Sequence, residues 1–223
     1  MAIDLRVDAV LADKVRLGLL VIDDLSVRES AADLAQAIAE RSRSIREAHV
    51  DTPSGQVPGV EEARRLYKAL GLDPTKTRPS NEALLRRVLK GEALYSINTL
   101  VDAVNLCSLS QQLPYGLYDL AQVEAPVVLR RGLDGEGYEG IRKGFVGVTG
   151  RPVLVDTHGP FGNPTSDSAR AAIRLETRRA LVVAYAPRQL SAARLDQALD
   201  ETAKMIARHC GGRCTERALL PQA

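Results

Sequence analysis

A short apolar segment near the N-terminus, Leu17–Ile22, constrains the fold more than any other part of the chain. It contains no charged or polar side chain, whereas a strand with one face in water alternates apolar and polar residues. A second, similar run, Leu181–Tyr185, lies towards the C-terminus. Both segments predict central strands, so other elements must pack against both faces of the sheet that they form.

Elsewhere, apolar residues recur at the spacing of amphipathic helices. With Ser80, Asn98 and Ser191 as N-caps, this spacing predicts helices at residues 30–47, 60–70, 80–90, 98–109 and 191–211. Further strands are predicted at residues 127–131 and 152–155, and glycine-rich hairpins at residues 132–150. Helices that flank a covered sheet indicate an α+β fold.

The composition sets outer limits on function. The chain has 223 residues, 45% of them hydrophobic, and a net charge of +2. It has no apolar stretch long enough to span a membrane, and its first residues lack the pattern of a signal peptide. We therefore expect a soluble, cytoplasmic protein with no membrane partner. Because the net charge is small, a surface that binds nucleic acid would have to be a local basic patch.

Two motifs that would suggest a bound group are rejected. Gly135–Gly140 reads G-x-G-x-x-G, but glycines and strand-forming residues follow it instead of a helix, so we expect no dinucleotide. His209, Cys210 and Cys214 lack a complementary pair of ligands elsewhere, so we expect no metal and a frayed helix end. Cys107 lies in an apolar helical run and is expected in the core.

The most polar candidate site is the segment Asp156–Ser168, which follows the strand predicted at residues 152–155. Glycine and proline fix the course of such a loop, while Asp, Asn, Ser and Thr side chains bond to the backbone or reach a ligand. Polar loops at the ends of buried strands commonly carry sites. The segment is either a turn held by its own side chains or one wall of a pocket, and composition alone favours the turn.

A second polar line runs along the otherwise apolar helix predicted at residues 98–109. Asn98, Asp102 and Asn105 are four and three residues apart, so they lie on one helix face. Buried Asp and Asn side chains cost several kcal/mol unless they are hydrogen-bonded. They either hold a neighbouring loop or line a polar cavity, and both can hold together. We expect this helix and the segment Asp156–Ser168 to face each other across one cavity.

The helix predicted at residues 80–90 has one basic side. Arg86, Arg87 and Lys90 lie opposite its apolar stripe, and Arg78 precedes it. A solvated charged face is the ordinary interpretation. Because every charge on this side is positive, a surface that contacts RNA phosphates is the alternative.

Three segments, in their order along the chain, resemble the B3/B4 domain of the phenylalanyl-tRNA synthetase beta subunit. They are Ile97-Asn98-x-x-Val101-Asp102-x-x-Asn105, Leu113-Pro114-x-x-x-Tyr118-Asp119-Leu120 and Gly159-Pro160-Phe161-Gly162-Asn163-Pro164-Thr165-Ser166-Asp167. The likeness covers about residues 78–185. It implies a three-layer α+β fold of the B3/B4 type, with a covered central β-sheet and flanking helices. Residues 78–223 would form this domain, with the last helix as an addition, and residues 1–77 a strand and helix layer packed on it.

The resemblance also implies a function. In the synthetase, this domain hydrolyses tyrosine wrongly attached to the phenylalanine tRNA, and it needs no metal ion or cofactor. The implied partner is therefore tRNA or aminoacyl-tRNA, with no DNA and no cofactor. The chain departs from the family at Gly116, where the synthetase has His, and at Asn163, which takes the place of an acidic residue. Specificity for tyrosine therefore does not carry over.

The resemblance and the polar pattern together give three groups of candidate residues. The catalytic candidates are Asn105, Asn163, Thr165 and Asp167. The substrate-binding candidates are Asn98, Asp102, Tyr115, Gly116, Asp156, Gly159, Phe161, Gly162 and Ser166. The RNA-binding candidates are Arg78, Arg86, Arg87 and Lys90. We expect the amino-acid side chain to lie near Phe161 and Tyr115, and the ester carbonyl to meet backbone N–H groups of residues 159–163.

Two functions are consistent with these residues. The first is a freestanding editing domain that binds tRNA and hydrolyses the ester of mischarged tRNA in trans. The second is a non-catalytic RNA- or amino-acid-binding module of the same fold. The departures at Gly116 and Asn163 favour the second function, and the retained polar residues between Asn98 and Asp167 favour the first. The sequence leaves the oligomeric state, the tRNA and the amino acid open.

Overall fold

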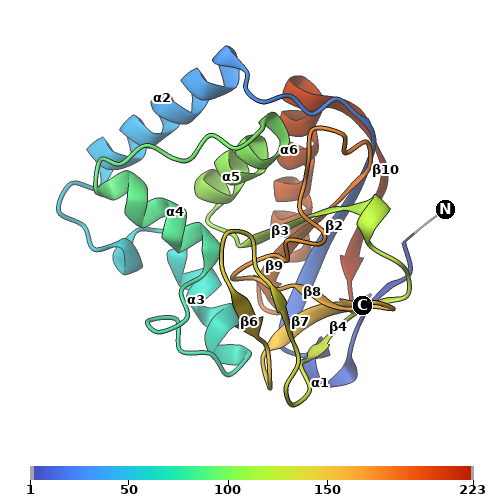
Figure 1. The fold of residues 1–223 in the computed structure, drawn as a ribbon. Helices are drawn as coiled ribbons and strands as arrows, with labels where there is room; N and C mark the ends of the chain where they lie inside the picture. Colours follow the sequence, from blue (N-terminus) through green and yellow to red (C-terminus); the bar gives the residue numbers. More distant parts are fainter. Residues whose placement is uncertain (1–2, 222–223) are drawn as a thin grey trace.

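In the computed structural model, which describes residues 3–221, strands and helices are mixed along the whole chain (Figure 1). The strands are β1 (Leu5–Val7), β2 (Val15–Leu25), β3 (Tyr115–Asp119), β4 (Val127–Arg131), β5 (Gly137–Glu139), β6 (Phe145–Gly147), β7 (Pro152–Asp156), β8 (Gly159–Gly162), β9 (Ala180–Pro187) and β10 (Gly211–Leu220). The α-helices are α1 (Ala9–Ala12), α2 (Ala32–Ala48), α3 (Val60–Ala69), α4 (Ser80–Leu89), α5 (Thr99–Gln111) and α6 (Ala192–Cys210).

Two four-stranded sheets form the centre of the molecule. The inner sheet has the strand order β10-β2-β9-β3 and is antiparallel throughout. The outer sheet has the order β1-β4-β7-β8, in which β1 and β4 run parallel. Helices α5 and α6 cover the face of the inner sheet that points away from the outer sheet (Figure 1). These three layers confirm the predicted α+β architecture.

The apolar run of β2 is uninterrupted because both faces of the strand are buried. Leu17, Leu19 and Val21 pack in the cluster shared with the outer sheet and α3, whereas Leu20 and Ile22 pack against α5 and α6. All five side chains are at most 2% exposed. Burying each such side chain is worth about 1.5–3 kcal/mol. The prediction of a strand covered on both faces is confirmed.

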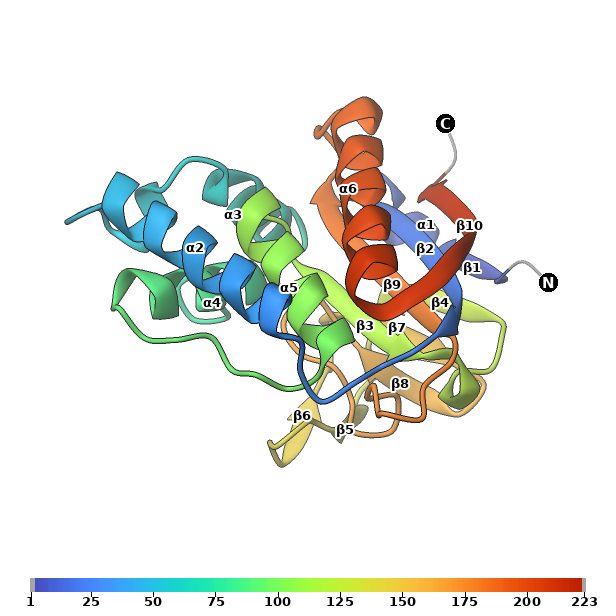
Figure 2. The ribbon, with the colours of Figure 1, turned by 90° about the horizontal axis from the view of Figure 1, so that it is seen from above.

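The helices α2, α3 and α4 gather at one end of the molecule, beside α5 (Figure 2). They share an apolar cluster, separate from the two clusters of the inner sheet, that contains Ile45, Val60, Leu85, Val88 and Leu109. All five predicted helices are present within one or two residues of their expected ends. Asn98 and Ser191 cap α5 and α6 as expected, accepting from the backbone N–H groups three residues ahead.

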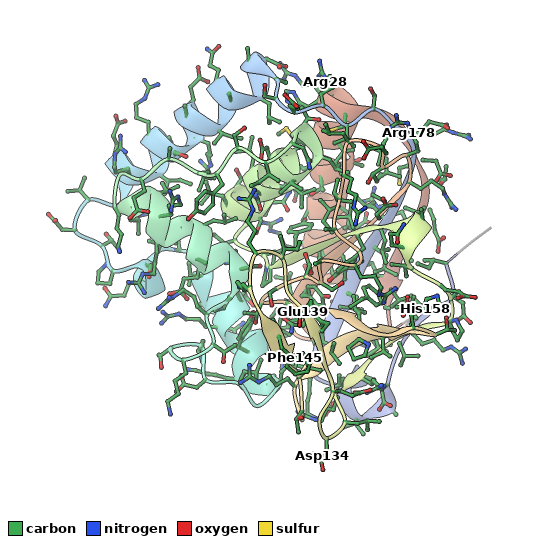
Figure 3. The ribbon with its side chains drawn as sticks, viewed as in Figure 1. Arg28, Asp134, Glu139, Phe145, His158 and Arg178 are labelled. Carbon is green, nitrogen blue, oxygen red and sulfur yellow. The ribbon has the colours of Figure 1, made fainter. Side chains whose placement is uncertain are left out.

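The glycine-rich stretch after β4 forms the hairpin β5–β6, in which Glu139 pairs with Phe145. Figure 3 shows these two residues together on the front of the molecule. The G-x-G-x-x-G motif therefore lies in a β-hairpin and opens no helix, as predicted.

Three local expectations were wrong. Ser80 does not cap α4, because Pro79 holds the N-cap position and Ser80 is already helical. The segment Asp156–Ser168 is not all loop, since β8 pairs with β7 to form a tight hairpin. The chain does not fray after α6; it turns at Gly211 into β10, and Cys214 lies exposed on that strand.

The N-terminal residues contribute strands directly to both sheets. β1 pairs with β4 in the outer sheet, and β2 pairs with β9 in the inner sheet. The division of the chain at residue 77 therefore stays a prediction about domain organisation. Each of the two four-stranded sheets contains strands from both sides of that division. Between residues 3 and 221, none of the helices is both long and apolar enough to cross a bilayer.

Candidate functional site

Two hollows lie on different sides of α5. The larger, here called the α2 groove, has a volume of about 420 Å³ and runs between α2, residues 91–96 and Asp102. The smaller, here called the Asp167 cavity, has a volume of about 170 Å³ and is enclosed by the start of α4, the middle of α5, strand β3 and the residues Ile141, Asp167 and Ile173. The catalytic candidates Asn105 and Asp167 meet at the smaller hollow.

Asp167 is the most unusual residue of this cavity. Its Oδ1 atom is buried and has no hydrogen-bond partner among residues 3–221, while Oδ2 accepts only a long bond, 3.4 Å, from the Leu117 N–H. Burial raises the pKa of Asp167 to about 7, although the nearby Tyr118 hydroxyl and the Leu117 N–H favour the carboxylate. A carboxyl with a pKa near neutrality that faces a cavity is suited to accept a proton.

The loop that carries Asp167 is held by its own polar side chains. The Oδ1 atom of Asn163 accepts from the N–H groups of Thr165 at 2.8 Å and Ser166 at 3.0 Å. The hydroxyl of Tyr67 donates to the carbonyl of Pro164 and lies 2.9 Å from Thr165 Oγ1. Asn163, Thr165 and Ser166 thus fix the loop and do not line the Asp167 cavity, so their proposed contact with substrate stays a prediction.

Tyr118 occupies the space that two glycines leave open. A Cβ atom added at Gly116 would lie 2.2 Å from the Tyr118 hydroxyl, and one added at Gly162 would lie 2.3 Å from it. The same hydroxyl is 3.2 Å from that of Tyr185. The position where the resembled family carries His is therefore filled by the end of Tyr118, and no side chain at residue 116 reaches a substrate.

Phe161 and Asp156 belong to the framework of the β7–β8 hairpin. Phe161 is fully buried and packs edge-on against Tyr118, with ring centroids 4.9 Å apart. Both carboxylate oxygens of Asp156 are paired with Arg170, at 2.9 and 3.0 Å. Because the Phe161 ring lies in the core and does not line the Asp167 cavity, its contact with a substrate side chain stays a prediction.

The expected oxyanion donors are also placed elsewhere. Gly159, with a φ of 108°, is the first residue of β8 directly after the turn, and the N–H of Asn163 donates to the carbonyl of Ser166. Residues 159–163 do not line the Asp167 cavity. Their backbone is therefore not available there to an ester carbonyl.

The polar line of α5 divides between the two hollows. Asn98 caps the helix, with its Oδ1 atom 3.0 Å from the Val101 N–H. Asp102 faces the α2 groove and accepts from the Ile97 N–H and the Ser96 hydroxyl. Asn105 and Tyr115 line the Asp167 cavity. The helix and the Asp167 loop do face each other across one cavity, but Asp102 and Thr165 are not part of it.

The four basic candidates differ in how firmly they are already bound. Arg78 lies 4.0 Å from Glu82, and Arg87 stacks on the ring of Tyr95 and pairs with Glu92 at 2.9 Å. Arg86 and Lys90 form no ion pair within the described residues and remain accessible to a phosphate.

Sequence reasoning missed two kinds of cavity residue. Ser80, expected as a cap, instead lines the cavity with a buried hydroxyl that has no hydrogen-bond partner in the described part of the chain. The only available signal was the preceding Pro79, which takes the capping position. Ile141 and Ile173 come from irregular segments far apart in sequence, and no local pattern marks them.

Comparison with known proteins identifies the family to which the chain belongs. A search of curated proteins found no match. Among solved structures, the chain is similar to the crystal structure of an N-terminal fragment of the phenylalanyl-tRNA synthetase beta-subunit from Pyrococcus horikoshii, at 12% sequence identity and a TM-score of 0.49. The alignment covers 100% of this chain and 55% of the other, so the chain spans about half the length of that fragment.

A family model described as the B3/4 domain matches residues 62–211. The matched region begins within α3 and includes all of α6, which we had expected to lie outside the likeness. It also spans every candidate site residue named above. Because this region is more than half of the 223 residues, the chain belongs to the B3/4 domain family.

Proposed function

We propose that the chain is a tRNA-associated editing domain that hydrolyses the ester of mischarged tRNA in trans, with Asp167 as the general base. Membership of the B3/4 family and the name of the similar structure support a role related to tRNA synthetases. The observation that carries the catalytic part is that Asp167, whose Oδ1 atom has no partner among residues 3–221, lines one cavity together with Asn105.

The reaction needs one water and no other reactant. The water oxygen bonds to the ester carbonyl carbon while Asp167 takes one of its protons. The bond from that carbon to the ribose oxygen then breaks, and Asp167 returns the proton to the ribose oxygen. The products are the free amino acid and a tRNA with a free terminal hydroxyl. A positioned general base contributes typically about 10²–10⁴-fold to such a step.

Asn105 is suited to orient the reacting groups. Its side chain lines the same cavity as Asp167 and makes no hydrogen bond within residues 3–221, and an amide offers both a donor and an acceptor. The donor would meet the ester carbonyl and the acceptor the attacking water. Orientation of this kind lowers the barrier without a covalent intermediate.

The filled space at Gly116 supports a second candidate, a non-catalytic module that binds RNA or an amino acid. Tyr118 fills the space at residue 116, and the residues that line the Asp167 cavity include no histidine to share the work of Asp167.

Incubation with a panel of charged tRNAs separates these two functions. We expect at least one aminoacyl-tRNA to lose its amino acid at least ~10-fold faster than in buffer. Binding of tRNA without release of any amino acid would instead identify the binding module. A chain that neither binds nor hydrolyses any charged tRNA would overturn both.

A further inference from the structure

The walls of the Asp167 cavity are mainly aliphatic. Leu84 of α4, Val101 and Val104 of α5, and Leu117 of β3 form much of the lining. Ile173 and the 43%-exposed Ile141 contribute the rest of the apolar surface. A ligand that fills this space therefore buries hydrocarbon against hydrocarbon, at roughly 25 cal/mol per Å² of apolar area.

Two polar residues of the lining direct their hydroxyls away from a ligand. The Tyr115 hydroxyl donates to Gln111 Oε1 at 2.6 Å and lies 3.0 Å from Thr202 Oγ1. The Ser108 hydroxyl donates to the carbonyl of Leu113 at 2.7 Å. Neither group is free to bond to a substrate.

The remaining polar groups are Ser80, Asn105 and Asp167. The Ser80 hydroxyl and Asp167 Oδ1 are buried atoms without partners among the described residues. An aminoacyl ester presents an ammonium group, a carbonyl and an ester oxygen, which together require these three side chains. No further hydrogen-bonding group is left for a polar amino-acid side chain, and an unpaired buried hydroxyl costs about 1–3 kcal/mol.

The size of the cavity leads to the same class of substrate. An apolar cavity of about 150 Å³ holds a molecule the size of benzene. With a volume of about 170 Å³, the Asp167 cavity has room for a branched four-carbon side chain beside the ammonium group and little room for a phenol ring in addition to it. Tyr118 already fills the space at Gly116 and Gly162, so neither glycine adds room to the cavity.

We propose that the cavity selects aminoacyl groups with a branched aliphatic side chain, of the leucine, isoleucine or valine type, over aromatic ones. This selectivity rests on the proposed editing function for the identity of the ester. It concerns binding as well as hydrolysis, so the two can be tested separately.

Binding is tested with stable analogues in which the amino acid is joined by an amide to 3′-amino-3′-deoxyadenosine. Calorimetry on the full chain compares the leucyl, phenylalanyl and tyrosyl analogues. We expect the leucyl analogue to bind at least ~10-fold more tightly than the tyrosyl one, the lower limit for a misfitted apolar group. Equal affinity, preference for the aromatic analogues, or binding of none of them would overturn the selectivity.

Hydrolysis is tested with one tRNA charged chemically with leucine, phenylalanine or tyrosine. A leucyl preference in binding with no hydrolysis of any ester would remove the editing function and leave the selectivity standing. Hydrolysis of all three esters at one rate would support the editing function and remove the selectivity.

Val104→Ala provides a variant that enlarges the cavity. We expect it to weaken the leucyl analogue by ~3- to 10-fold and to strengthen the phenylalanyl one. Val88→Ala is the control, because Val88 is similarly buried but does not itself line the cavity; it packs in the cluster shared by α2, α3 and α4. If both variants change the analogue preference alike, the effect comes from general loosening and the assignment of the lining is wrong.

Discussion

The two hollows beside α5 differ in size and in how well their carboxylates are satisfied. The α2 groove is larger, about 420 Å³ against 170 Å³. Its carboxylate, Asp102, accepts from the Ile97 N–H at 3.0 Å and the Ser96 hydroxyl at 3.3 Å, and only the Ser42 hydroxyl there is a buried atom without a partner in the described residues. In the smaller cavity, the Oδ1 atom of Asp167 and the hydroxyl of Ser80 both lack a hydrogen-bond partner among the described residues.

This contrast is the reason why the proposed chemistry is assigned to the smaller cavity. Burial raises the pKa of both aspartates, but Asp102 uses its oxygens to hold the segment before α5. Asp167 has one buried oxygen, Oδ1, without a hydrogen-bond partner in the described residues. The groove is the larger of these two hollows, but the buried polar atoms without partners favour the cavity.

The largest expected effect comes from Asp167→Asn. Loss of the general base should lower the rate of deacylation by at least ~100-fold, about 2.7 kcal/mol of barrier. The matched variant in the other hollow, Asp102→Asn, should keep its rate within ~3-fold and lower the melting temperature instead. Single-turnover deacylation and thermal melting measure both. Equal losses of rate in the two variants would erase the contrast between the hollows.

The pH dependence sharpens the assignment of the base. Because the pKa of Asp167 is raised to about 7, the rate should rise with pH up to about 7 and level off above it. A flat profile between about pH 5.5 and 8 would exclude Asp167 as the group that accepts the proton.

The next effect concerns the two glycines beneath Tyr118. Gly116→Ala places a Cβ atom 2.2 Å from the Tyr118 hydroxyl, so we expect a loss of stability of about 1–3 kcal/mol. Gly144→Ala is the control, since a Cβ atom there meets nothing within 4 Å. Chemical denaturation measures the difference. Adding Tyr118→Phe to Gly116→Ala removes the nearest atom and should recover part of the stability.

Stability should also depend on pH through Asp167. Its pKa is raised in the folded chain, so the folded state binds the proton more tightly than the unfolded state, and stability is lost as pH rises from about 4 through about 7. Asp167→Asn should therefore stabilise the chain at pH 8 by on the order of 1–2 kcal/mol and have little effect near pH 4. If Asp167→Asn changed the melting temperature equally at both pH values, burial would not raise the pKa of this carboxylate.

The smallest effect is expected on the basic side of α4. Replacing Arg86 and Lys90 together by Gln should weaken tRNA binding by ~3- to 10-fold and reduce the salt dependence by about one to two charges. Arg87→Gln should change it less, because Glu92 and Tyr95 already hold that guanidinium. Fluorescence anisotropy over a salt series measures both. A larger effect of Arg87 would mean that its partners release it to RNA.

The fold was largely predictable where one physical signal dominates. Continuous apolar runs located β2 and β9, and helical spacing located α2 to α6. β10 was missed because its exposed residues show no buried face, and it forms only by pairing along β2. β8 was missed because its sequence of Gly, Pro, Phe and Gly resembles a turn, and the neighbouring β7 makes it a strand.

The site was predictable only in part. Asp167 and Asn105 were named because their segments are polar in an otherwise apolar setting. Their meeting with Ser80, Ile141 and Ile173 depends on the packing of four distant segments, which no local pattern records. The space that the Tyr118 side chain fills depends in the same way on two strands, because it is left open by Gly116 of β3 and Gly162 of β8.

Strand β10 has a consequence for any shortened form of the protein. Its ten residues occupy the edge of the inner sheet and pair with β2 from Leu25 to Leu17. A chain cut at residue 211, where the family match ends, would leave the backbone of an apolar strand open along one side. Open apolar edges recruit strands from other molecules. In the full chain, β10 instead places charged side chains along this edge, among them Arg213 and Arg217 with their partners Asp24 and Asp196, and charge on an edge strand disfavours such pairing.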